Sequence, residues 1–561
     1  MKDAPANKIE RRAPETVMRL SRLGSFHQSR LSFMRILTRR MAREGWHFSR
    51  PQFEIDTRGV GHAVYTATGP ERAYSLIAFA HDLPPEMRSD RVIATAWDAT
   101  FTLFDGIPTP ADIERLRANV PLQEAGRVSA RELSVSRANR SVRLWAQVVE
   151  ALSEGRQPDP QELSKTGYLM RTTAVYGSGK LGAADYATIQ HRPEMSAPFQ
   201  AEMLSVYLTR AFVRDLVNHM ARARGGAKAV PLDPALARGL GIGNSTGLGL
   251  GPFILNHPRL FNNWIAAREK ALARVRRVEH ASADDIALFH RVLKGGMRML
   301  SRWQSAHPVQ VDKLSALRAD ADRINAHLDR ADLGGAAPWD RLYRWAEGAL
   351  SEEGQEWLAS LMLEPYGALI DDLAGEMADR TPASTIDGAM PVATMTALIE
   401  QVFGWALALD WTSQEAQARI WYVSEAKLEP RLGERFEEPL APYEQPLAPA
   451  RDAVAFHETL SAFAVDTPLS DVLRAHPEHR HIARRLQGTV TAPYGEVRDN
   501  TIDAALFPVD LLRVKLAFFG ACAFDPRSDR WLRICMYPGA PYPEDLCPDN
   551  ADLWVYGEGA A

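Results

Sequence analysis

The spacing of apolar residues divides the chain into stretches of different predicted structure. Residues 16–41 carry apolar side chains every three or four positions, which predicts a helix with a break at Gly24 and Ser25. Its many arginines should cover the outer face of a helix that docks on the surface, with a membrane-surface or targeting helix as the alternative. Further along, apolar and polar residues alternate, which is typical of half-buried strands. The predicted strands are 53–55, 60–67, 73–80 and, with helix as the alternative, 91–104.

Helical spacing returns after residue 111 and dominates the middle of the chain. We expect the stretch 132–152 to be helical, with Arg137, Arg140 and Arg143 on or near one face. A segment rich in proline and glutamate, 429–450, should run extended along the surface. The further predicted helices are 197–224, 258–275, 284–303, 309–333, 339–379 and 391–411.

These elements predict an α+β fold rich in helix. A mixed or antiparallel sheet should be built from N-terminal and C-terminal strands, with a large helical lobe around it. A chain of 561 residues exceeds the size at which one core stops growing, so we expect two or three lobes. The predicted division is a basic, amphipathic helical arm at 1–50, a sheet-containing lobe made of 51–108 with 415–561, and a mainly helical lobe at 109–414.

A short repeat is the reason for joining the two ends. Ala78-Phe79 and Ala517-Phe518 are each followed, after eight residues, by the tetrapeptide Arg-Ser-Asp-Arg, at 88–91 and 527–530. A looser copy follows Trp421-Tyr422. We interpret each copy as an apolar strand that leads into a proline-containing turn bearing arginines, with chance similarity as the alternative.

Composition narrows the classes of function. Hydrophobic residues make up 46% and charged residues 24% of the chain, and the net charge of -4 argues against nucleic acid as a partner. No run of eighteen apolar residues and no secretory signal occur, so we expect no transmembrane segment and a cytoplasmic location. The three cysteines contain no C-x-x-C pair, which fits a reducing compartment. Self-association into a homo-oligomer stays open.

A glycine-rich stretch near the middle of the chain is the first candidate for ligand binding. Six glycines lie in residues 239–251, around the polar residues Asn244, Ser245 and Thr246. Such a loop can present backbone N–H groups and short side chains to a phosphate or carboxylate, and His257 lies just before the next helix. A tight packing loop is the alternative interpretation.

Three stretches resemble known motifs, but each lacks a feature that its motif requires. Residues 243–247 fit G-x-S-x-G, but the residues before them predict no strand, which argues against a Ser245 nucleophile. Residues 239–243 lack the βαβ unit of a dinucleotide loop. Gly177 and Lys180 lie in a glycine-rich turn that lacks phosphate-loop spacing, so Lys180 either neutralises an anion or is a plain exposed lysine.

Metal binding and cofactors leave no clear sign in the sequence. His476, His479 and His481 lie close together, but the proline and basic residues around them indicate the start of a surface helix. We therefore expect no metal site there. No motif for a Rossmann-bound nucleotide occurs either, and the identity of any cofactor is unknown.

These features predict an enzyme that acts on a small anionic substrate, of undetermined reaction class, held by glycine-rich loops and arginines. The alternative is a non-enzymatic protein that binds a ligand or partner through the helical lobe and the basic N-terminal helix. Exposed strand ends and internal Arg to Asp pairs would explain the same residues without a ligand. The predicted substrate-binding residues are Gly177, Lys180, Asn244, Ser245, Thr246, Arg431, Arg498, Arg527 and Arg530, and the predicted catalytic residues are Glu425, His257 and Tyr422.

Overall fold

One mixed sheet of nine strands runs through the part of the chain that the computed structural model describes. Its order is β1-β2-β3-β4-β5-β6-β7-β13-β12, so the first strands share a sheet with the last two. The predicted α+β class, rich in helix, and the joining of both ends in one sheet are confirmed. The structure describes residues 9–84, 86, 96–119, 129–172, 189, 191–247, 258–378, 386–411, 420–422, 430–431, 434–435, 443–445, 450–498, 508–521, 523–528 and 531–556. The strands of this sheet are β1 His47–Ile55, β2 Gly61–Thr68, β3 Ala73–Ala80, β4 Ala99–Asp105, β5 Glu132–Arg140, β6 Tyr168–Thr172, β7 Gly241–Gly247, β12 Ala523–Ser528 and β13 Trp531–Met536.

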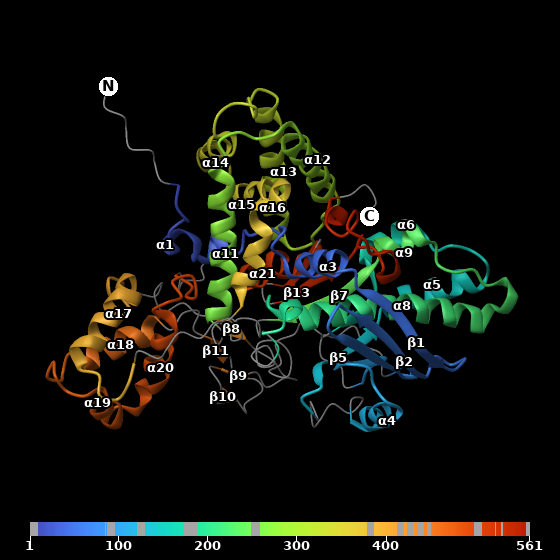
Figure 1. The fold of residues 1–561 in the computed structure, drawn as a ribbon, viewed down its shortest axis with the longest axis horizontal. Coiled ribbons are helices and arrows are strands. Elements are labelled where there is room, and N and C mark those ends of the chain that lie inside the picture. Colours follow the sequence, from blue (N-terminus) through green and yellow to red (C-terminus); the bar gives the residue numbers. More distant parts are fainter. Residues whose placement is uncertain are drawn as a thin grey trace.

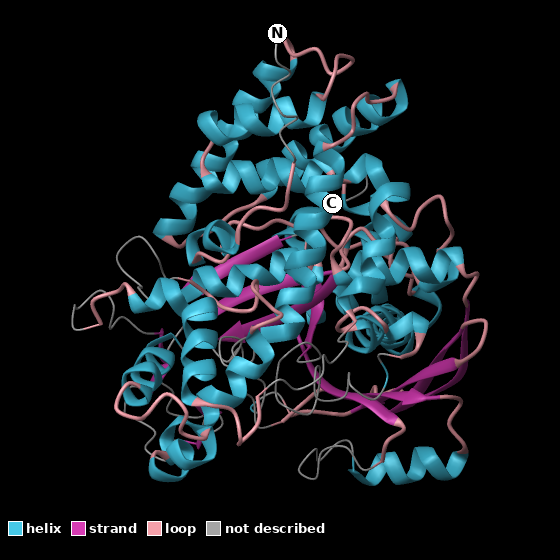
Figure 2. Cartoon of the chain, turned by 60° about the vertical axis from the view of Figure 1, so that its left-hand side comes forward, coloured by secondary structure: helices cyan, strands magenta, loops and turns pink. Residues whose placement is uncertain are grey.

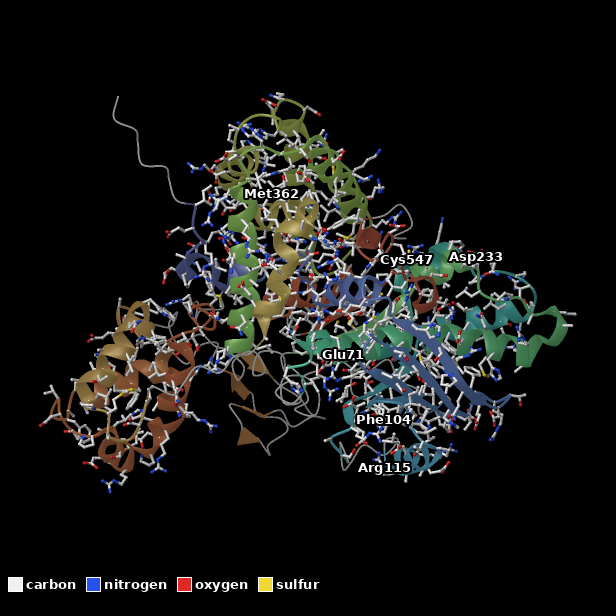
Figure 3. All side chains as sticks on the ribbon, in the orientation of Figure 1. Glu71, Phe104, Arg115, Asp233, Met362 and Cys547 are labelled. Atoms are coloured by element: carbon white, nitrogen blue, oxygen red, sulfur yellow. The ribbon has the colours of Figure 1, made fainter. Side chains whose placement is uncertain are left out.

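The first five strands form an antiparallel meander with both faces covered. In β3, Leu76 packs into the main core on one face, whereas Ile77 joins a smaller cluster on the other. Helix α8 (Gln200–Gly225) covers the first face, and α4 (Pro110–Asn119) covers the second. Figure 3 shows Phe104 and Arg115 together at this second face, from β4 and α4. The predicted strands 53–55, 60–67 and 73–80 are therefore confirmed, as is strand at the end of 91–104.

Strands β6 and β7 run parallel, with Thr172 opposite Asn244, whereas β7 pairs antiparallel with β13. The prediction that the glycine-rich residues 241–247 form a loop is wrong, because they form the strand β7. A Cβ added at Gly243 would lie 2.8 Å from the ring of Tyr168, and one at Gly241 would lie 2.2 Å from the carbonyl oxygen of Met536. These two glycines are therefore needed for close packing between strands.

Most helices form a layer on one side of the sheet, which Figure 2 shows above the strands. Their cores are continuous with the main core of the sheet. The predicted helices 197–224, 258–275, 284–303 and 309–333 are confirmed, with boundaries shifted by a few residues. The helices of this part are α5 Leu144–Ser153, α6 Pro160–Thr166, α9 Pro234–Gly239, α11 Pro258–Arg276, α12 Ala283–Arg302, α13 Pro308–Leu328, α14 Pro338–Ala349, α15 Glu352–Met362, α16 Gly367–Ile370 and α21 Pro508–Phe519. The short 3-10 helices beside them are η2 Pro193–Met195, η3 Gly226–Lys228, η4 Glu364–Tyr366, η5 Asp371–Met377, η7 Pro543–Asp545 and η8 Leu553–Val555.

Four helices near the C-terminus form a separate group, called here the C-terminal helical unit, which lies apart at the left of Figure 1. Its core is a cluster of its own, centred on Phe403, Phe456 and Leu486. Its members are α17 Val392–Leu407, α18 Ala450–Leu460, α19 Leu469–Ala475 and α20 Arg480–Thr489, with η6 Pro477–His479 between the last two. Short strand pairs between this unit and the main sheet are β8 Ile420–Tyr422 with β11 Tyr443–Gln445, and β9 Pro430–Arg431 with β10 Glu434–Arg435.

The N-terminal segment is embedded in the main core instead of lying on the surface. It forms α1 Pro14–Val17, α2 Leu20–Leu23 and α3 Phe33–Arg43, so the predicted break near Gly24 is present. The expectation of outward arginines is wrong, because Arg22, Arg30 and Arg35 are buried. Each of them pairs with carboxylates from distant parts of the chain, which removes the cost of burying the charge alone.

Two further expectations are corrected. The first half of 132–152 is the strand β5, not a helix. The sequence did not show this strand because two of its buried positions, Ser134 and Ser136, are polar residues. In the repeat, Ala78-Phe79 lies in β3 but Ala517-Phe518 lies in helix α21, so the two copies are not equivalent. The tetrapeptide at 88–91 lies outside the described residues.

The proposed lobe boundaries stay predictions. The sheet does take three strands, β5, β6 and β7, from the stretch assigned to the helical lobe. None of the described helices has both the length and the apolar character needed to cross a lipid bilayer.

Candidate functional site

Lys515 is a fully buried amine at the centre of the molecule. It lies on α21, which packs against β12 and β13 and also against α2 and α3. Its Nζ donates a hydrogen bond to Oδ1 of Asn244 at 2.8 Å and lies 5.6 Å from the ring centre of Phe519. Elsewhere on the same helix, Phe518 packs on Trp264 with ring centres 4.2 Å apart.

Asn244 links this amine to the parallel strands. Its side-chain nitrogen donates to the carbonyl oxygen of Thr172 at 2.8 Å, so the amide is held by β6 while its oxygen receives Lys515. Thr172 is the last residue of β6, and β7 ends three residues after Asn244, at Gly247. The hydrogen bonds from Lys515 to Asn244 and from Asn244 to Thr172 therefore lie near the carboxyl ends of the parallel strands β6 and β7. Ligands commonly bind at this position in α/β sheets.

The charge state of Lys515 follows from its burial. Removal from water lowers the pKa of Lys515 to about 7, and no carboxylate of the described residues acts on it as a charged partner. An amine with such a pKa is neutral in about half of the molecules at pH 7. It can therefore accept a proton or react as a nucleophile, which an ordinary lysine does poorly.

The other buried cation of α21 points away from this site. Arg513 lies two positions earlier, about 200° around the helix, and forms an ion pair with Glu353 of α15. His27 lies 3.4 Å from the same carboxylate and stacks on Trp303. Burial tends to raise the pKa of Glu353, but Arg513 and His27 outweigh it and lower that pKa to about 2. Burial also lowers the pKa of His27, so this second group is an ion pair of Arg513 and Glu353 with the imidazole of His27 beside it.

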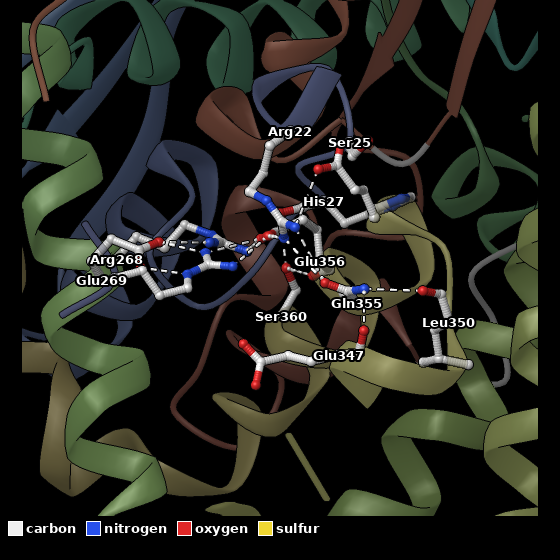
Figure 4. A network of polar contacts seen from close by, with 12 residues as sticks. Arg22, Ser25, His27, Arg268, Glu269, Glu347, Leu350, Gln355, Glu356 and Ser360 are labelled. Carbon is white, nitrogen blue, oxygen red and sulfur yellow. Dashed lines mark hydrogen bonds and ion pairs between the residues drawn. The ribbon is translucent and has the colours of Figure 1, made fainter. Parts of the chain in front are cut away.

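A larger cluster, called here the arginine–glutamate network, ties the N-terminal segment to the helices. Figure 4 shows Arg22 and Arg268 reaching Glu356, with Glu269 beside Arg268. The carboxylate oxygens of Glu356 lie 2.5 Å from a guanidinium nitrogen of Arg12 and 2.7 Å from one of Arg22 and one of Arg268. Glu269 binds Arg12 at 2.6 Å and Arg268 at 3.2 Å.

The arginine–glutamate network is closed to solvent. Burial tends to raise the pKa of Glu356, but Arg12, Arg268 and Arg22 hold it far below its ordinary value. The sequence-based expectation that Arg268 looks outward from α11 is wrong, because its guanidinium is buried in this cluster. Both carboxylates, Glu269 and Glu356, are matched by arginines, so the network fixes the fold.

The structure describes only part of the predicted site. Asn244 is buried beside Lys515, as given above. The backbone of Ser245 and Thr246 lies in β7, opposite Arg533 and Leu532 of β13. Only the backbone is described for Tyr422 in β8, Arg431 in β9 and Arg527 in β12, and Gly177, Lys180, His257, Glu425 and Arg530 lie outside the described residues.

Arg498 lies in a different environment from Asn244. Its guanidinium pairs with Glu15 at 3.4 Å and lies 5.1 Å from the ring centre of Trp405, and its backbone N–H donates to Met18. Burial lowers the pKa of Arg498. These contacts join the N-terminal segment to the C-terminal helical unit, and none of them involves Lys515.

Lys515 was not among the residues predicted from sequence. The signal was a single lysine within an apolar helix, in the run Val514-Lys515-Leu516-Ala517. A lysine there can also extend to solvent, so the pattern alone does not separate the two cases. Among the described residues, one group of side chains lies close enough together to hold a metal ion, and it lies on η6 and the residue before it, in the C-terminal helical unit.

Comparison with known proteins identifies no relative. The chain matches no protein-family model, no curated protein and no solved structure. A site at Lys515 is therefore supported by its contacts and burial alone.

Proposed function

We propose that the chain is an enzyme that binds a small carboxylate- or phosphate-bearing substrate where β6 and β7 end, with Lys515 as its proton-accepting group. The observation that supports this is the buried amine of Lys515 held on Asn244 with no carboxylate partner among the described residues. Buried lysines are normally paired, because an isolated buried charge is costly. A substrate anion would supply the missing partner.

The order of the sequence supports the same edge of the sheet. Because β6 and β7 are parallel, both end at this edge. In the sequence, the glycine-rich stretch with Gly177 and Lys180 follows β6 within a few residues, and Gly249 and Gly251 follow β7. We propose that these stretches, with Ser245 and Thr246, contribute backbone N–H groups to the substrate.

The predicted arginines and proton-transfer residues complete the proposal. Arg431, Arg527 and Arg530 would bind the anionic groups, and Glu425, His257 or Tyr422 would exchange protons with the substrate. Lyase, hydrolase and transferase chemistry are all compatible with a lysine base. The double variant Arg431→Ala with Arg527→Ala should weaken substrate binding, and unchanged binding would remove these arginines from the site.

A thermal-shift screen with a matched pair of variants tests the site. The panel contains phosphorylated sugars, nucleotides, CoA esters, dicarboxylates and amino acids. A ligand at about 100 times its dissociation constant adds about 2.7 kcal/mol to stability. We expect one anionic class to raise the midpoint of the natural chain and of Lys270→Met, whose lysine is half exposed in an ion pair with Glu376, but not that of Lys515→Met.

Two outcomes contradict the proposal. An equal rise in Lys515→Met would place the ligand elsewhere, and no rise with any anion would favour the alternative of a partner-binding protein. That alternative relied on an exposed basic N-terminal helix. The burial of Arg22, Arg30 and Arg35 removes much of that surface.

A further inference from the structure

Two histidines and a glutamate come together at the start of α20, away from Lys515. One ligand atom from each of His476, Glu478 and His479 lies within 4.8 Å of the others. The side chains of His476 and Glu478 are 39% and 61% exposed, so an ion can reach them from solvent. His479 is buried against Phe456, with ring centres 5.0 Å apart, which fixes the plane of the imidazole.

Hydrogen bonds determine which nitrogen of His479 is free. The hydroxyl of Thr459 has one hydrogen, and its Oγ1 donates to the carbonyl oxygen of Ala455 at 3.0 Å. The same Oγ1 lies 2.8 Å from Nε2 of His479, so it accepts there and Nε2 carries the hydrogen. Nδ1 of the neutral ring keeps its lone pair. An imidazole held through one nitrogen by a polar neighbour is the usual form of a metal ligand.

The other two side chains are already in contact. Nδ1 of His476 lies 3.0 Å from Oε1 of Glu478, and a metal ion would replace the proton shared between them. The third histidine of this stretch is engaged elsewhere, since Nε2 of His481 lies 3.0 Å from Asp452 and its Nδ1 lies 2.8 Å from the carbonyl oxygen of Glu478. His481 is therefore a neighbour of the cluster and not a member.

We propose that His476, Glu478 and His479 bind a divalent first-row transition metal ion of the Zn²⁺ type. Two imidazole nitrogens and one carboxylate oxygen match the preference of Zn²⁺, whereas Ca²⁺ and Mg²⁺ prefer sites made of oxygen ligands. Water would complete the coordination, because two of the three ligands are exposed. The sequence alone argued against this site, since the contacts of Thr459 and Phe456 with His479 arise only when α18 packs on η6.

Calorimetric titration of the full chain with Zn²⁺, after treatment with EDTA, tests the proposal. We expect saturable binding of one ion per chain. The substitutions Glu478→Gln and His476→Ala should weaken it at least about tenfold. His481→Ala is the matched control and should bind as the natural chain does. The exposed residues are chosen because His479 packs in the core, where its loss would disturb the fold.

The titrations of the natural chain and of the three variants either support or overturn the metal site. Zn²⁺ binding that is lost in both cluster variants and kept in His481→Ala, with no competition from Mg²⁺, supports the site. No saturable binding in the natural chain overturns it. Binding retained in Glu478→Gln and His476→Ala, or lost equally in His481→Ala, overturns it as well.

Discussion

The amine of Lys515 makes the stability of the chain depend on pH in a direction that can be worked out. Its pKa in the fold is about 7, against an ordinary value of 10.5. Between these values the unfolded chain binds a proton that the folded chain does not, so this group makes stability rise with pH from about 7 to 10.5. Below pH 7 the full cost of burying the amine is present.

Substitution of Lys515 by methionine should therefore stabilise the chain at neutral pH. Methionine keeps the length and removes the charge, so the gain in the free energy of unfolding should be on the order of a few kcal/mol at pH 7 and vanish above pH 10.5. Denaturant unfolding at several pH values measures it. The exposed control Lys270→Met should change stability by less than about 1 kcal/mol at pH 7. A loss of stability in Lys515→Met at pH 7 would show that the amine is paired.

Gly243 illustrates a backbone position that only glycine fits. A Cβ there would lie 2.8 Å from the buried ring of Tyr168, so Gly243→Ala should destabilise the chain by about 1–3 kcal/mol. Gly348, inside α14, has no atom within 4 Å of an added Cβ. Gly348→Ala should stabilise by up to about 1 kcal/mol through helix propensity. Thermal unfolding compares the two, and equal effects would contradict the packing role of Gly243.

The arginine–glutamate network fixes the N-terminal helices to α11 and α15. Glu356→Gln leaves Arg12, Arg22 and Arg268 without their shared carboxylate, and we expect a loss of about 3–5 kcal/mol at pH 7. Because the pKa of Glu356 is lowered in the fold, the difference from the natural chain should shrink as pH falls below 4.5.

Glu162 provides the control for this network. It forms an exposed ion pair with Lys165, so Glu162→Gln should leave the free energy of unfolding nearly unchanged. Urea unfolding at pH 7 and at pH 4 measures the free energy of unfolding of the natural chain, of Glu356→Gln and of Glu162→Gln. A small effect of Glu356→Gln at pH 7 would mean that the arginines find other partners.

The sequence predicts those helices and strands whose apolar residues recur at regular spacing. Strands β2 and β3 and helices α8, α11 and α12 are recognisable because one of their faces is continuously apolar. Strand β5 is missed because its buried positions include serines, and Arg268 is missed because its partner Glu356 comes from a distant helix. Burial of a polar residue depends on such partners, which local patterns do not contain.

The site follows the same rule. Asn244 was predicted because glycine-rich surroundings are unusual, although they form a strand. Lys515 was missed because its burial depends on β6, β7 and α21, which are far apart in sequence. The common feature is a polar group whose role is set by non-local contacts.

At the scale of the whole molecule, the C-terminal helical unit has a core separate from that of the sheet. We expect it to open independently, because its smaller core contributes less free energy than the main core does. Native-state hydrogen exchange should show the amides of α17, α18 and α20 exchanging together at lower denaturant than those of α8. Exchange of both groups in one step would contradict this independence.

The most direct test of the proposed site is the pKa of Lys515 itself. Lysine labelled with ¹³C at the ε position can be followed by NMR from pH 5 to 11, with the signal assigned by its absence in Lys515→Met. The structure predicts that Lys515 titrates near pH 7, and a bound anionic ligand should raise that pKa. If the Lys515 signal titrates near 10.5 instead, the amine is solvated or paired with a carboxylate, and its role as the base of an anion-binding site is contradicted.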